Sequence, residues 1–114
     1  MIIKGNEISM IRGDSETIQV SCRDMNDEKI KFISGDRVYM TVKESIHTSE
    51  KLFQKVIETF TEDGDAIIEI NPEDTKNMCF DTYVYDVQFV KADGKVTTII
   101  PPNKFTILGE VTYD

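Results

Sequence analysis

The sequence predicts an all-β fold, an antiparallel sandwich of two sheets with seven or eight strands. Residues that branch at Cβ (isoleucine, valine and threonine) make up 35 of the 114 residues, whereas leucine and alanine number two each. Branched side chains lose rotamer freedom in a helix and fit a pleated sheet. Apolar and polar residues also alternate in several short runs, which places one face of each run on a core and the other toward water.

Three such runs lie in the first half of the chain, and we expect strands at residues 7–11, 16–23 and 35–44. Gly13-Asp14 separates the first two, because glycine adopts turn conformations at little cost. The polar residues 24–31 are typical of a loop, and Gly35-Asp36 opens the third strand.

The second half continues the pattern, and we expect its strands at residues 51–60, 66–71, 82–90, 95–100 and 104–108. Residues 62–65 contain Gly64 between acids and predict a hairpin turn. Pro101-Pro102 is expected to break the sheet, because neither residue can donate a ladder hydrogen bond.

One short helical turn is expected near residues 72–77. Asn71 suits the N-cap, Pro72 suits the first helical position, and the acids that follow suit the helix dipole. This turn leads into a strand with Tyr83 and Tyr85 near its start, as in the tyrosine corner of immunoglobulin-like sandwiches. We therefore expect an immunoglobulin-like topology, with residues 1–114 as a single domain.

Charge and length exclude several classes of function. The formal net charge is −8 and the pI about 4.6, which argues against nucleic acid and against an anionic membrane surface as partners. No apolar run approaches the ~20 residues of a membrane span. The first residues lack the basic and apolar regions of a signal peptide, so we expect no export.

No reactive centre is predicted. Cys22 and Cys79 are expected to be free thiols, because Cys79 precedes the strand that would carry an immunoglobulin-type bridge and no export signal is present. A zinc site needs about four ligands, and His47 is the one histidine, in a polar stretch typical of a solvated loop. We expect no metal, no cofactor and no enzymatic activity.

Two short motifs have simpler interpretations than binding. Asp24, Asn26 and Glu28 alternate as in a calcium loop, but Lys29 stands where such a loop has its glycine. Residues 12–14 spell the cell-adhesion tripeptide Arg-Gly-Asp at a place where a turn between strands is expected.

Surface patterning gives the remaining candidates. Residues 58–76 contain seven acids and one lysine, either as a solvated hairpin or as a surface that steers a basic partner. Several strands carry apolar residues on both faces, so a loop or another protein chain must cover the second face. The residues we expect at such an interface are Phe53, Ile57, Phe60, Ile67 and Ile99.

A longer pattern of turns and strands is more specific. It comprises residues 35–43, 54–57, 63–75, 83–89, 93–94 and 98–107. Over residues 11–112 the chain resembles small prophage-encoded proteins of Gram-positive bacteria, and it is similar to the N-terminal domain of phage baseplate upper proteins.

The resemblance implies an immunoglobulin-like sandwich that is made in the bacterial cytoplasm and assembles into a virion tail or baseplate. It implies contacts with other phage structural proteins, a homo-oligomer (often a trimer in such proteins) and no catalytic residue. The alternative is a host-surface or carbohydrate-binding module of a phage particle. That function needs aromatic platforms, and the chain has four tyrosines and no tryptophan.

Overall fold

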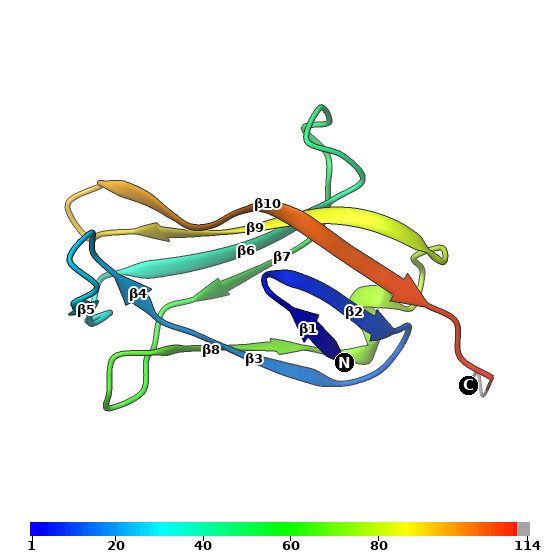
Figure 1. The fold of residues 1–114 in the computed structure, drawn as a ribbon, viewed down its shortest axis with the longest axis horizontal. Helices are drawn as coiled ribbons and strands as arrows, with labels where there is room; N and C mark the ends of the chain where they lie inside the picture. The colour runs from blue at the N-terminus through cyan, green and yellow to red at the C-terminus, as the bar shows by residue number, and fades with distance from the viewer. Residues whose placement is uncertain (112–114) are drawn as a thin grey trace.

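The largest element is a six-stranded sheet with the strand order β1-β2-β10-β9-β6-β7 (Figure 1). The structure is a computed structural model that describes residues 1–111. In sheet order the strands are β1 (Ile2–Lys4), β2 (Glu7–Ile11), β10 (Val96–Leu108), β9 (Asp81–Val90), β6 (Arg37–Lys43) and β7 (Lys51–Ile57).

Two short strand pairs and one helical turn complete the fold. β3 (Glu16–Val20) pairs with β8 (Ala66–Ile70), and β4 (Cys22–Arg23) pairs with β5 (Lys29–Ile30). The helix α1 (Pro72–Thr75) follows β8. Strands account for 52% of the chain, which confirms the all-β prediction. No helix among residues 1–111 is long and apolar enough to cross a membrane.

The core lies between one face of the large sheet and the β3–β8 pair. Alternate residues of the central strands point to this face, among them Val38, Met40 and Val42 of β6, which are fully buried. The inward side chains of β3 and β8 belong to the same hydrophobic cluster. The smaller pair therefore packs on the larger sheet, and the opposite face of the larger sheet carries the half-buried and exposed residues.

The helical turn forms where the sequence predicts it. Pro72 is the first helical residue, and the carboxylate of Asp74 accepts a hydrogen bond from the backbone N–H of Asn71 at 2.7 Å. The chain then enters β9, where the Tyr83 hydroxyl donates to the Cys79 carbonyl oxygen at 3.0 Å.

Two predictions of strand pairing are wrong. β2 and β10 pair in parallel, with Ile8 opposite Phe105, so the large sheet is mixed and not purely antiparallel. Parallel partners need a long connection, and here nearly the whole chain supplies it. Residues 62–65 form a turn, but β7 and β8 on either side belong to different sheets and make no hairpin.

Several strand boundaries also differ. β10 continues through Pro101 and Pro102, because register shifts on either side of Ile100 absorb the missing donors, and β2 pairs with β10 only from Phe105 onward. The expected strand at residues 16–23 is divided into β3 and β4, and β5, which lies in the expected loop at residues 24–31, pairs with β4. β7 stops at Ile57, and β1 lies outside the expected strands.

Candidate functional site

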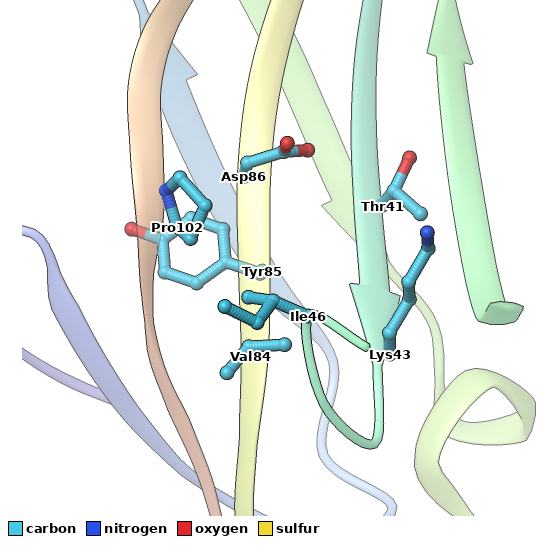
Figure 2. A pocket seen from close by; sticks show the side chains of 7 residues that line it. All are labelled: Thr41, Lys43, Ile46, Val84, Tyr85, Asp86 and Pro102. Carbon is cyan, nitrogen blue, oxygen red and sulfur yellow. The ribbon is translucent and has the colours of Figure 1, made fainter. Parts of the chain in front are cut away.

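The outer face of the large sheet carries a small pocket of about 140 Å³. Neighbouring strands supply most of its lining, and Ile46 comes from the loop between β6 and β7. In Figure 2 the Asp86 carboxylate extends from β9 toward β6, where Thr41 and Lys43 lie. The complete lining is Thr41, Lys43, Ile46, Val84, Tyr85, Asp86 and Pro102.

Asp86 is the pocket's acidic group. Burial raises the pKa of its carboxyl group, and the positive charge of Lys43 opposes that rise. Thr41, which lies directly opposite Asp86, accepts a hydrogen bond from the Gln54 amide at 2.8 Å. A space of this size with one carboxylate and one amine in its lining suits a small polar group. This pocket is not evident from the sequence, because it depends on which strands are neighbours in the sheet.

A larger hollow, of about 390 Å³, lies where β7 ends beside β8. We call it the β7–β8 groove. Its apolar lining joins the solvent-facing sides of both layers, because Val56 lies on the outer face of β7 and Ile67 on that of β8. The complete lining is Val56, Ile57, Glu58, Thr59, Phe60, Thr61, Ile67 and Glu69.

Three of the five predicted interface residues meet in this groove, namely Ile57, Phe60 and Ile67. Phe60 also packs on the core ring of Phe32, with 5.2 Å between ring centroids. Each of the three is half-buried, so each keeps some surface in contact with solvent.

The other two predicted interface residues lie elsewhere. Phe53 faces the core, where its ring lies 5.9 Å from that of Phe105. Ile99 lines a second hollow of about 390 Å³ between β10, β3 and the β1–β2 turn. In that hollow the Tyr85 hydroxyl donates to the Asn6 carbonyl oxygen. A docking role for Phe53 and Ile99 stays a prediction.

Ion pairs lie around the β7–β8 groove. Lys55 contacts Asp74 of α1 at 2.6 Å, with both side chains largely buried. Arg37 contacts Glu58 at 3.2 Å on the exposed side. Glu69 is exposed on β8. Glu69 lies in the acidic stretch of residues 58–76, and Val56 shares an exposed face of β7 with Leu52, but neither is among the five residues expected at an interface.

The two cysteines and the histidine have different surroundings. Both cysteines are free thiols, Cys22 buried and Cys79 exposed, and burial raises the pKa of Cys22. His47 is exposed in the loop between β6 and β7. Among residues 1–111 no group of three or more histidine, cysteine or acidic side chains is placed to hold a metal ion.

The two short motifs are used within the fold. The Asp24 carboxylate accepts hydrogen bonds from the backbone N–H groups of Asn26 and Glu28, so it shapes a turn. In the Arg-Gly-Asp tripeptide, the Arg12 guanidinium binds Glu110 at 2.6 Å and lies 4.4 Å above the Phe80 ring. This ion pair lowers the pKa of Glu110.

No protein-family model, no curated protein and no solved structure matches this chain.

Proposed function

We propose that this chain is a non-enzymatic assembly module of a phage or prophage tail or baseplate and acts through protein–protein contacts. The observation that carries the proposal is the β7–β8 groove, which gathers Ile57, Phe60 and Ile67 at an edge of the fold. β7 is the last strand of its sheet. Such an edge can supply backbone hydrogen bonds to a neighbouring subunit, while the side chains set specificity.

An immunoglobulin-like topology is part of this proposal. The order β10-β9-β6-β7 corresponds to strands G-F-C-C′ of a variable-type domain, and the β3–β8 pair corresponds to B–E. The hydrogen bond from the Tyr83 hydroxyl to the Cys79 carbonyl lies where the tyrosine corner of such domains lies. Domains of this architecture serve many functions, so support for the docking role comes from the groove and not from the topology.

The location in a phage particle rests on the resemblance to baseplate upper proteins. A host-surface or carbohydrate-binding role has less support, because the rings of Tyr83 and Tyr85 are buried and one face of the exposed Phe80 ring is covered by the Arg12 guanidinium at 4.4 Å.

The location can be tested on purified particles. We expect mass spectrometry of particles induced from the lysogenic host to detect the chain in a fixed ratio to the tail proteins, and antibodies against it to label the tail end. Tail and lysis genes beside its gene would agree with this result. The proposal would be overturned if the chain were found only in the cell lysate and its gene lay in a metabolic operon.

A further inference from the structure

We propose that the β7–β8 groove binds an extended, basic segment of a partner protein, with apolar side chains in the groove and lysine or arginine side chains toward its acidic rim. The inference rests on the proposed docking function and adds the chemistry of the partner. It is carried by the shape of the groove together with its charge.

The shape of the groove suits an extended chain. The groove follows the end of β7, the last strand of the large sheet, and β8 lies alongside. Val56 is 45% exposed on β7, and Ile67 is half-buried on β8. An added strand alternates its side chains, so every second residue can place an apolar group against these two side chains.

The charge of the groove's rim determines which charge a partner segment must carry. Glu58 and Glu69 line the groove, and Glu62 and Asp63 are exposed in the adjoining turn. Lys55, the lysine of β7 nearest to the groove, is held by Asp74 at 2.6 Å with 18% of its side chain exposed. Glu58 is paired with Arg37 at 3.2 Å. The negative field at the rim therefore comes from Glu62, Asp63 and Glu69, and it attracts a basic segment and repels an acidic one.

A second copy of this chain is the weaker occupant. Each copy carries a formal net charge of −8. Two copies that meet at this edge would bring the acidic rims near each other, and like charges across an interface oppose association. A groove occupied by a second copy is therefore an outcome that would overturn the proposal.

The test uses the full chain and three synthetic peptides of seven residues, the length of β7. The peptides alternate lysine with valine, lysine with serine, and glutamate with valine. We expect the lysine–valine peptide to shift the backbone amide signals of residues 56–61 and 66–69 in NMR titrations, and its affinity to fall as salt rises. The other two peptides should bind much more weakly.

Two matched pairs of variants locate the binding. Glu69→Lys should weaken binding of the lysine–valine peptide about threefold or more, whereas the same change at the exposed Glu7 of β2, Glu7→Lys, should not. Ile67→Ser should weaken this binding about tenfold, whereas Val96→Ser, at an exposed position of β10, should not. Urea midpoints for all four variants show whether each one folds. If Ile67→Ser does not fold, the Glu69→Lys variant, which changes an exposed side chain, still tests the inference.

Each outcome decides the inference. Equal weakening by Glu7→Lys and Glu69→Lys means binding to net charge alone, and it would overturn the inference. So would a lysine–valine peptide that leaves the groove amides unmoved, or a concentration-dependent dimer that shields them. If the lysine–valine peptide does not bind while the chain is still found in purified particles, the proposed function stands and this partner is wrong. If the peptide binds while the chain is absent from particles, the groove has this ligand and the proposed location in a phage particle is wrong.

Discussion

Tyr83 shows how one side chain fixes the path of the backbone. Its ring is buried in β9, and its hydroxyl holds the Cys79 carbonyl at 3.0 Å, just before the strand begins. Burial raises the pKa of this hydroxyl, so it remains a hydrogen-bond donor at neutral pH. The chain between α1 and β9 is thereby tied to the sheet.

We expect Tyr83→Phe to lower the free energy of unfolding by about 1 kcal/mol, because it removes one hydrogen bond and leaves the ring in place. Urea denaturation at neutral pH measures the change. The control is Tyr39→Phe, whose hydroxyl makes an exposed contact with Arg37 at 3.5 Å. A loss for Tyr39→Phe as large as that for Tyr83→Phe would contradict the assignment.

Asp65 is expected to link stability to acid pH. Its carboxylate forms an ion pair with the Lys29 ammonium at 2.8 Å and accepts a hydrogen bond from the Gln19 amide at 2.7 Å. These contacts lower the pKa of Asp65, although burial opposes the change. Since the folded pKa lies below the unfolded value of about 3.9, the stabilisation is present above about pH 4 and is lost as pH falls through the folded pKa.

Asp65→Asn should therefore be less stable than the unmodified chain at neutral pH, and the difference should shrink as the solution is acidified below pH ~4. Urea midpoints measured from pH 7 to pH 2 give the profile. Asp63→Asn removes an equal charge from an exposed position in the same turn. Identical profiles for the two variants would show that the Asp65 contacts do not control the effect.

At the scale of elements, Gly13 and Gly64 illustrate two reasons why a turn requires glycine, a positive φ and a close approach to another segment. Both have positive φ, +80° and +83° respectively. A Cβ at Gly13 would meet nothing within 4 Å, whereas a Cβ at Gly64 would lie 2.5 Å from the Cβ of Lys31 and 2.9 Å from its Cα. The turn between β7 and β8 is therefore pressed against the chain that follows β5.

We expect Gly13→Ala to cost about 1 kcal/mol, the strain of a left-handed backbone, and Gly64→Ala to cost about 2–5 kcal/mol, because steric overlap is added to the same strain. Thermal or urea unfolding of the two variants gives the comparison. Equal losses at both positions would mean that the close approach to Lys31 carries no energetic weight.

The alternation of apolar and polar residues predicts most of the strands. It does not predict features that depend on which strands pair with each other. β2, β6 and β8 match their expected ranges within two residues at each end, because each has one buried and one exposed face. β4 and β5 are two-residue strands, too short for a pattern to show. Nothing in the local sequence states that β2 runs parallel to β10, or that β10 passes through Pro101 by a shift of register.

The candidate site was predictable in part, for the same reason. Apolar residues on both faces of residues 51–60 marked Ile57 and Phe60, which do line the β7–β8 groove. Phe53 belongs to the same pattern, but it packs on Phe105. Which face of a strand meets the core follows from its register with β6, and register is a property of the assembled sheet.

For the whole molecule, Phe105 is the residue that joins the most distant parts of the core. It is fully buried, pairs with Ile8 of β2 and Tyr83 of β9, and contacts the rings of Phe53 and Tyr85 at centroid distances of 5.9 and 6.1 Å. Strands from both ends of the sequence therefore share one set of contacts.

Phe105→Ala should lower the free energy of unfolding by about 3–5 kcal/mol, the range for an aromatic ring removed from a packed core. Unfolding followed by far-UV and near-UV circular dichroism should give coincident transitions, because the cluster is shared by both sheets. The exposed Val96→Ala is the control, with a change below about 0.5 kcal/mol. Two separate transitions would show that the layers unfold independently.

The parallel alignment of β2 and β10 has a mechanical consequence. When two parallel strands are pulled from the N-terminal end of one and the C-terminal end of the other, the force runs along both strands in opposite directions. The hydrogen bonds from Ile8–Ile11 to Phe105–Leu108 then bear the load together in shear and do not open one after another. When the domain is stretched through the residues that flank these strands, it should resist extension until the hydrogen bonds of this short ladder break together.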